Sequence, residues 1–480
     1  MSDRGDISPQ DFARAFRSVV EWAAIHGREE RSPFKTMLSE HFGSDPSMFP
    51  VIGESIAPYD LPNVQVALDA YLGRDGVEHR LVGFGGPVGY AEMSLSGLVH
   101  DIGFGLAVGP VRRTTVPLDG DRSVTCVTAG LFLISEAGRR LAVLLMQGHH
   151  GFDAPGLRLE VLAAEQHTGE QFVADVHALM REHNVYRGKV LALKGGPMMG
   201  GVMSVEFPAV DAVSRDEIVL PEGVLDAIEL HTVEFARVAD ALIGAGRHLR
   251  RGLLLHGPPG TGKTLSSSYL IGRLEGRTVL VLTGSALGLV SEACAIARDL
   301  QPSMVVLEDV DLVAQERTAM GLGATSLLFQ LLNEMDGIGE DADVIFVMTT
   351  NRADLLEPAL AARPGRVDQA IELPLPDAAA RERLIRLFAT GLEAELKDTA
   401  PLVKATEGVA PAFLRELVRK AALLAATSGA TTVSDEHLKE ALELLERGGQ
   451  ITRTLLGGDG GAALGRLSGG GWAEVDDWDE

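Results

Sequence analysis

The sequence predicts an α/β protein in which a doubly wound parallel-sheet domain with a small helical lid follows an α+β domain. The first observation is RGLLLHGPPGTGKT at 251–264, where a short apolar strand leads through a glycine-rich loop into a helix. The second is a series of apolar runs at 278–282, 304–307 and 344–348, which alternate with helical stretches. Strands and helices in alternation build a parallel sheet that binds ligands at its carboxyl strand ends.

The expected boundaries divide the chain into an N-terminal α+β domain (1–212), a large domain (213–376), a helical lid (377–447) and a glycine-rich acidic tail (448–480). The low complexity of the tail predicts disorder. Its two tryptophans, Trp472 and Trp478, leave two interpretations open, a solvated tail or a segment that docks on a basic groove.

The first part of the N-terminal domain shows helical periodicity at Ser8–His26 and again at Leu61–Leu72. Prolines and glycines between Pro33 and Pro62 predict an irregular segment. The dense glycines between Val82 and Gly109 predict turns between short strands, or a loop with a binding role.

The second part of this domain is predicted to be a hairpin and two further β segments around a helix. The runs 122–134 and 140–147, joined by Ser-Glu-Ala-Gly, are typical of a β-hairpin, and 157–163 alternates as a third strand. Thr168 and Gln171 form a capping-box pattern for a helix that Asn184 can end. Strands at 186–193 and 202–207, around a Gly- and Met-rich loop, are expected to close the domain near Ala212, and His149–His150 is interpreted as a surface pair.

The glycine-rich loop fits G-x-x-x-x-G-K-[ST], the phosphate-binding loop of nucleoside triphosphate sites. Its glycines let successive backbone N–H groups face one anion, and the following helix start adds positive charge. Lys263 would contact the β- and γ-phosphates and Thr264 would ligate Mg²⁺. The residues expected to bind the nucleotide here are Gly257, Pro258, Pro259, Gly260, Thr261, Gly262, Lys263 and Thr264.

Polar side chains follow the next two apolar runs. Glu308 and Asp309 end the run at 304–307, and Asn351 ends the run at 344–348. One acid can hold Mg²⁺ and the next can polarise the attacking water, which the Asn351 amide can orient. Arg363 and Arg366 then lie in a turn, either as an ion-pair site or as cations offered to a nucleotide on a neighbouring subunit.

Composition limits the class of partner and the compartment. The formal net charge is −24 over 480 residues, which argues against a protein that follows a nucleic-acid backbone. The only cysteines, Cys126 and Cys294, lack metal-ligand spacing and fit a reducing compartment. The start of the chain lacks the pattern of a signal peptide, and no apolar run approaches the ~18 residues of a membrane span. The sequence therefore predicts a cytoplasmic protein with no membrane segment.

From about Asp216 to Gly448 the chain resembles an AAA-type ATPase of the AAA+ superfamily. The resemblance rests on GPPGTGKT, on the strand-end acids, on TTN and on LEPALAARPGRVDQAIELPLPD. It implies a homo-oligomeric ring, mostly a hexamer, with ATP and Mg²⁺ at each subunit interface. It further implies that Lys263 and Thr264 are Walker A, Glu308 and Asp309 Walker B, Asn351 sensor 1, and Arg363 and Arg366 arginine fingers. The stretch around Gly408 resembles the lid region that holds part of the adenine pocket.

The chain departs from this pattern at three places. The usual Asp-Glu of Walker B is Glu308–Asp309, a third arginine is replaced by Gln369, and the segment 283–302 lacks the aromatic pore loop of members that thread a polypeptide. LEDVD and RHLRRGLLLHGPPGTGKT are similar to the branch that contains the mitochondrial translocase of the Rieske iron–sulfur protein. That branch has a membrane span, so the similarity to it is local.

The leading functional expectation is a ring ATPase that remodels or assembles a protein client recruited by the N-terminal domain. The shorter acid at Asp309 keeps open a nucleotide-gated scaffold with little turnover. A nucleic-acid motor is the third alternative, disfavoured by the charge. A fused metalloprotease is excluded by motif, because the sequence contains no H-E-x-x-H.

Overall fold

The computed structural model describes residues 33–86, 93–100, 106–148, 156–195, 203–311, 342–354 and 367–447, with residue 18 and some positions between 331 and 339. Residue contacts divide the chain into two compact units, one of residues 1–185 with 202–204 and one of residues 186–201 with 205–480. The expected helix at Ser8–His26 lies outside the described residues, apart from Ser18, as do the His149–His150 pair and the tail at 448–480.

The first unit is built on a seven-stranded antiparallel sheet in the order β1-β7-β6-β5-β2-β3, with β4 paired to the first half of β5. Its strands are β1 (Val51–Ile56), β2 (Val77–Gly85), β3 (Ala107–Gly109), β4 (Arg112–Pro117), β5 (Ser123–Glu136), β6 (Arg139–Gln147) and β7 (Leu157–Ala163). Its helices are α2 (Pro33–Phe42), α3 (Leu61–Leu72), α4 (Leu95–His100) and α5 (Gln166–Glu182).

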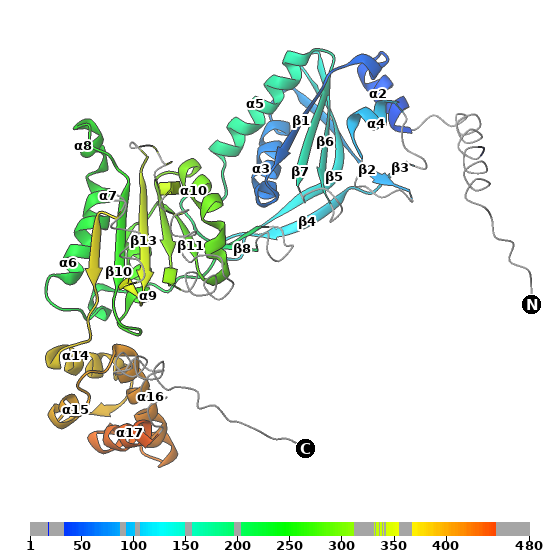
Figure 1. Ribbon diagram of the computed structural model, residues 1–480. Coiled ribbons are helices and arrows are strands. Elements are labelled where there is room, and N and C mark those ends of the chain that lie inside the picture. The colour runs from blue at the N-terminus through cyan, green and yellow to red at the C-terminus, as the bar shows by residue number, and fades with distance from the viewer. Residues whose placement is uncertain are drawn as a thin grey trace, which may run out of the picture. The chain divides into compact units, whose positions relative to one another are not determined.

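Helices cover both faces of this sheet (Figure 1). Alternate residues of β5 enter different cores, because successive side chains of a strand point to opposite faces. Phe132 and Ile134 pack with residues of α3 and α5, while Leu131 and Leu133 pack with residues of α2 and α4. The unit is therefore α+β, as expected.

Several local predictions for this unit are confirmed and two are wrong. The helix at Leu61–Leu72, the hairpin and the strand at Leu157–Ala163 are present, and the hairpin turn is Ala137–Gly138, both with positive φ. The segment 33–62 is not irregular, because it contains α2 and β1 between its prolines. Helix α5 starts at Gln166, so Thr168 lies inside its first turn instead of capping it.

The second unit contains a seven-stranded sheet in the order β14-β10-β13-β12-β11-β8-β9. Its strands are β8 (Val190–Lys194), β9 (Ser204–Glu206), β10 (Arg251–His256), β11 (Thr278–Leu282), β12 (Ser303–Leu307), β13 (Val344–Thr350) and β14 (Gln369–Glu372). The pairings from β14 to β8 are all parallel, which confirms the doubly wound sheet.

The domain boundary predicted at residue 212 differs from the structure. β8 pairs with β11 through Val190–Val279, Leu191–Leu280 and Ala192–Val281, so it extends the parallel sheet of the second unit. The described boundary therefore falls between Val185 and Tyr186. β8 and β9 extend the sheet of the second unit instead of closing the N-terminal domain.

Helices complete the sheet layer of the second unit. Before the glycine-rich loop, helical segments follow one another as α6 (Val224–Glu229), a π-helical turn (Leu230–Glu234), α7 (Phe235–Arg237) and α8 (Ala239–Gly244). Helix α9 (Lys263–Arg273) follows the glycine-rich loop. After β11, a 3₁₀ turn (Gly284–Leu289) leads directly into α10 (Val290–Asp299).

The lid consists of four helices and a two-stranded pair. They are α14 (Ala378–Phe388), α15 (Ala400–Ala405), α16 (Pro411–Thr427), α17 (Asp435–Arg447), β15 (Ala394–Glu395) and β16 (Val433–Ser434). Asp377 caps α14, since its carboxylate accepts the Ala380 N–H. Val219 packs in the lid core while its neighbour Ile218 packs in the sheet core, so this segment joins the two. Within the described residues, no helix combines the length and apolar character needed to cross a membrane.

Candidate nucleotide site

The loop between β10 and α9 has the backbone conformation that the glycine pattern predicts. Gly257 and Gly260 adopt φ values of +141° and +77°. A Cβ on Gly257 would lie 2.3 Å from the Leu373 carbonyl oxygen, and one on Gly260 would lie 2.9 Å from the Ala412 Cβ. Only glycine fits these two positions, because both the backbone angles and the space exclude a side chain.

Lys263 is the buried cation of this loop. Its side chain is only 6% exposed, and its Nζ donates hydrogen bonds to the carbonyl oxygens of Gly257 (2.9 Å) and Pro258 (2.8 Å). Burial lowers the pKa of Lys263 to about 8, an effect that the charges of Asp309 and Asp311 partly oppose. An incoming phosphate would supply the negative charge that the buried ammonium lacks.

The Thr264 and Glu308 side chains lie beside each other. Burial raises the pKa of the Glu308 carboxyl, the neighbouring Asp309 charge raises it further, and a hydrogen bond with the Thr264 side chain opposes both. A hydroxyl and a carboxylate are hard oxygen ligands of the kind Mg²⁺ takes alongside phosphate and water. Among the described residues there is no cluster of three or more His, Cys, Asp or Glu able to hold a metal alone. The residues present therefore fit Mg²⁺ bound together with a nucleotide.

Asp309 and Asn351 also meet. The Asn351 Nδ2 donates to Asp309 Oδ1 at 3.1 Å, and both residues line one pocket with Lys263 and Thr264. This places a carboxylate and an amide beside the predicted phosphate position, where a water can be held between them.

Asp311, which the sequence analysis did not identify, fixes the positions of Thr350 and Asn351 beside the pocket. Asp311 is 3% exposed and accepts hydrogen bonds from the Thr350 hydroxyl (2.8 Å) and the Asn351 backbone N–H (3.1 Å). It thereby ties the end of β13 to the chain that leaves β12. The third acid of LEDVD was the available signal.

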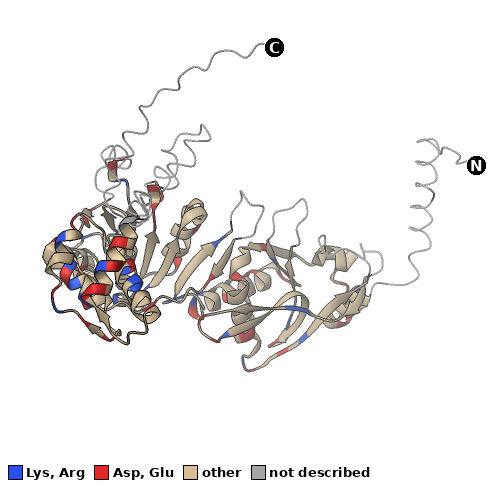
Figure 2. Cartoon of the chain, turned by 90° about the horizontal axis from the view of Figure 1, so that it is seen from below, with Lys and Arg blue, Asp and Glu red and all other residues tan. Residues whose placement is uncertain are grey.

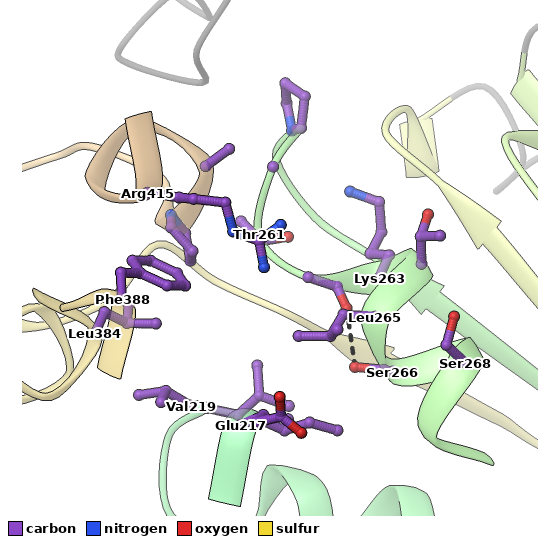
Figure 3. Close-up of a pocket in the computed structure, with 18 of the residues that line it drawn as sticks. Glu217, Val219, Thr261, Lys263, Leu265, Ser266, Ser268, Leu384, Phe388 and Arg415 are labelled. Carbon is purple, nitrogen blue, oxygen red and sulfur yellow. Dashed lines mark hydrogen bonds between the residues drawn. The ribbon is translucent and has the colours of Figure 1, made fainter. Parts of the chain in front are cut away.

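The pocket has a volume of about 800 Å³ and lies between the loop and the lid. Figure 3 shows Thr261 and Lys263 on the loop side and Leu384, Phe388 and Arg415 on the lid side. The Arg415 guanidinium lies 5.2 Å from the centroid of the Phe388 ring. The apolar side chains suit a planar base and the opposite side suits its phosphates. No local pattern in the lid helices indicated Phe388 or Arg415.

Other predicted site residues are placed differently. Pro259 to Thr264 line the pocket, whereas Gly257 and Pro258 are not among its lining residues and act through Lys263. Gly408 does not line it either; it has φ +75° after α15, and Pro411 and Ala412 face the pocket instead. Arg363 and Arg366 lie outside the described residues.

Comparison with known proteins gives a family match that lies within the second unit. Residues 253–375 match the family described as "ATPase family associated with various cellular activities (AAA)". The chain is 34% identical over 267 residues to ATP-dependent zinc metalloprotease FtsH 2 of Symbiobacterium thermophilum, covering 53% of this chain and 44% of that protein. It is 36% identical over 239 residues to FtsH 1 of Sphaerobacter thermophilus, covering 46% and 36%.

A relative of another kind is also similar to part of the chain. The 26S proteasome regulatory subunit 10B of Dictyostelium discoideum is 32% identical over 218 residues, covering 43% of this chain and 55% of that protein. The chain thus spans between about a third and just over a half of the length of these relatives.

Proposed function

We propose that this chain hydrolyses ATP with Mg²⁺ and uses the energy to remodel or assemble a protein client, because residues 253–375 match the AAA family of ATPases. The observation that carries the proposal is the convergence of Lys263, Thr264, Asp309 and Asn351 on one pocket, with Glu308 hydrogen-bonded to Thr264. The relatives named above include ATP-dependent proteases and a proteasome subunit, which supports a protein as client.

The residues have the following proposed roles. Lys263 neutralises the β- and γ-phosphates, and Thr264 and Glu308 would hold Mg²⁺, which when bound offsets the charge of the phosphates. Asn351 orients a water, and Asp309 accepts its proton as the water oxygen bonds to the γ-phosphorus and the bond to the ADP oxygen breaks. Leu384 and Phe388 pack against the base.

The assembly and the client are further parts of the proposal. We place the nucleotide at the interface of a homo-oligomeric ring, a hexamer by family resemblance, and assign client recruitment to the first unit. The similarity to the Rieske-protein translocase branch stays local, so its substrate is not assigned. The protease activity named in the relatives is not carried over, because the sequence has no H-E-x-x-H.

Two alternatives make different predictions. A nucleotide-gated scaffold would bind ATP with hardly any phosphate release, since Asp309 is one methylene shorter than glutamate. A nucleic-acid motor would show ATPase activity that DNA or RNA stimulates in a salt-dependent way. The net charge of −24 favours neither nucleic acid nor any other polyanion as partner.

The test compares Lys263→Ala with Asp309→Asn, using Lys404→Ala as a control that removes an exposed lysine of the lid. Lys263→Ala should weaken Mg·ATP binding at least roughly tenfold in titration calorimetry, about 1.4 kcal/mol. Asp309→Asn should bind normally but release phosphate about 10²–10⁴ times more slowly, because the amide cannot accept the proton. Wild-type ATP affinity in Lys263→Ala would contradict the loop assignment. If Glu308→Gln binds Mg·ATP yet is inactive while Asp309→Asn is active, the two acids have exchanged roles.

A further inference from the structure

The backbone of Asp309 is in a conformation that its residue type adopts infrequently. Its φ is +51°, and Ala137 is the only other non-glycine residue of the described chain with a positive φ. This left-handed region costs an L-residue roughly 1–2 kcal/mol, although aspartate tolerates it better than most. The turn comes directly after β12, where the chain leaves the sheet and Glu308 and Asp309 follow each other.

Hydrogen bonds to two neighbouring strands hold this turn. The Glu308 N–H donates to the carbonyl oxygen of Leu282, the last residue of β11, at 3.0 Å. The Asp309 N–H donates on the other side to the Thr349 Oγ1 of β13, also at 3.0 Å. Regular pairing of β12 with β13 ends one step earlier, at Leu307 and Met348. A side-chain hydroxyl therefore provides the acceptor where the backbone ladder has stopped.

Thr349 has the properties of a fixed support. It is 1% exposed and does not line the pocket, so it acts on the site through Asp309. Its strand end is itself anchored, because Asp311 accepts hydrogen bonds from Thr350 and from the Asn351 backbone. Two residues later along the same strand end, Asn351 holds the Asp309 carboxylate. Residues 349 and 351 thus hold Asp309 by its backbone and by its side chain.

We infer that Thr349 is a positioning residue for the ATPase reaction, which sets the left-handed turn of Asp309 so that this short acid reaches the attacking water. The inference rests on the proposed function of the site. A glutamate carboxylate could reach the water by rotation of its longer side chain. The position of the aspartate carboxylate depends more directly on where the backbone is placed. Loss of the hydroxyl acceptor should therefore lower turnover while leaving nucleotide binding in place.

The experiment uses the full chain with Thr349→Val, which keeps the shape and removes the hydroxyl, and Thr349→Ser, which keeps the oxygen. Thr278→Val is the matched control: Thr278 is also fully buried and its hydroxyl also accepts a backbone N–H, that of Gly188, at 3.0 Å. For Thr349→Val we expect kcat to fall about ten- to hundredfold, in keeping with the cost of misplacing a reacting group by about 1 Å. The affinity for Mg·ATP should stay within about twofold, and Thr349→Ser should recover most of kcat.

A second measurement does not depend on activity. Hydrogen exchange at the Asp309 amide should be slow in the wild type, faster in Thr349→Val and slow again in Thr349→Ser. Thr278→Val should instead accelerate exchange at the Gly188 amide and leave that of Asp309 unchanged. Unchanged kcat in Thr349→Val, no recovery by serine, or loss of ATP affinity together with kcat would each overturn the inference. If the wild type proves inactive, the proposed function fails and the catalytic part of the inference fails with it. The exchange data then decide the structural part alone: Asp309 protection that depends on Thr349 shows that Thr349 fixes the Asp309 turn, and its absence refutes that.

Discussion

At the scale of single residues, Lys263 combines two demands that oppose each other. It must be charged to hold phosphate, yet burial lowers its pKa to about 8 and its Nζ is satisfied by two loop carbonyls. Desolvation outweighs the attraction of Asp309 and Asp311 in this balance. A bound polyphosphate would return the pKa toward its ordinary value, so nucleotide binding and protonation of Lys263 are linked.

This linkage predicts how ATP affinity depends on pH. Below about pH 8 the free lysine is already charged, so affinity should be nearly constant. As pH rises through about 8, binding must take up a proton, and affinity should fall by up to about tenfold per pH unit. Titration calorimetry from pH 7 to 9.5, in buffers of different ionisation enthalpy, would measure both the affinity and the proton uptake. Lys263→Arg is the control, because its guanidinium does not titrate in this range. A wild-type affinity that stays constant up to pH 9.5 would contradict the linkage.

The residues that sequence alone identified share a local cause. Lys263 and Thr264 follow from one loop, and Glu308, Asp309 and Asn351 end neighbouring parallel strands, so a motif and a strand order suffice to bring them together. Phe388 and Arg415 were not predictable in the same way. They reach the pocket only because the lid helices pack where they do, and an aromatic or an arginine on an amphipathic helix is compatible with many other positions.

At the scale of elements, β8 shows why the domain boundary was misplaced. Its sequence, Val190–Lys194, is as suitable for an antiparallel strand as for a parallel one, and it follows directly on the first unit in the chain. Its partner β11 begins at Thr278, far along the sequence, and no local pattern indicates such a pairing. The prediction of an irregular segment at 33–62 was wrong for a related reason. Prolines at the start of α2 and between short elements are compatible with regular secondary structure.

The position of β8 predicts the behaviour of two fragments. A fragment 186–480 keeps β8 beside β11, whereas a fragment 213–480 leaves the buried residues Val279 and Leu280 on an open sheet edge. Because unpaired edges of apolar strands promote association, the shorter fragment should melt at lower temperature and aggregate. Thermal unfolding and light scattering would measure this, with 186–447 as a control that removes a comparable length from the other end. Equal melting temperatures for 186–480 and 213–480 would show that β8 adds nothing to the sheet.

At the scale of the whole molecule, acidic residues dominate the charge. Figure 2 shows lysines and arginines interspersed with aspartates and glutamates along the described elements. The 67 acidic residues outnumber the 43 basic ones, so any cation that acts on the nucleotide has to be placed by specific structure. Among the residues lining the pocket, Lys263, Arg415 and Arg419 are the cations that the described part of the chain supplies.

The last prediction concerns cations supplied by a neighbouring copy. Arg363 and Arg366 follow β13 by a short stretch of sequence, and we expect them to act on the nucleotide of the next subunit in a ring. Arginine fingers are worth roughly 10³–10⁵ in rate in related chemistry. ATPase activity should therefore rise steeply with protein concentration as rings form. Arg366→Ala should lose activity, while Arg386→Ala, an exposed lid arginine paired with Glu382, should keep it.

Mixing Arg366→Ala subunits with Lys263→Ala subunits then tests whether the arginine acts between copies. Neither variant alone has both a working loop and a working finger, but a mixed ring contains interfaces where an intact Lys263 site faces an intact Arg366. We expect partial recovery of phosphate release, limited to interfaces of one order around the ring. As a control, mixing either single variant with subunits that carry both Arg366→Ala and Lys263→Ala should give no recovery. A demonstrated monomer whose specific activity is independent of concentration would show that the arginines act within one chain, most simply as an ion-pair site.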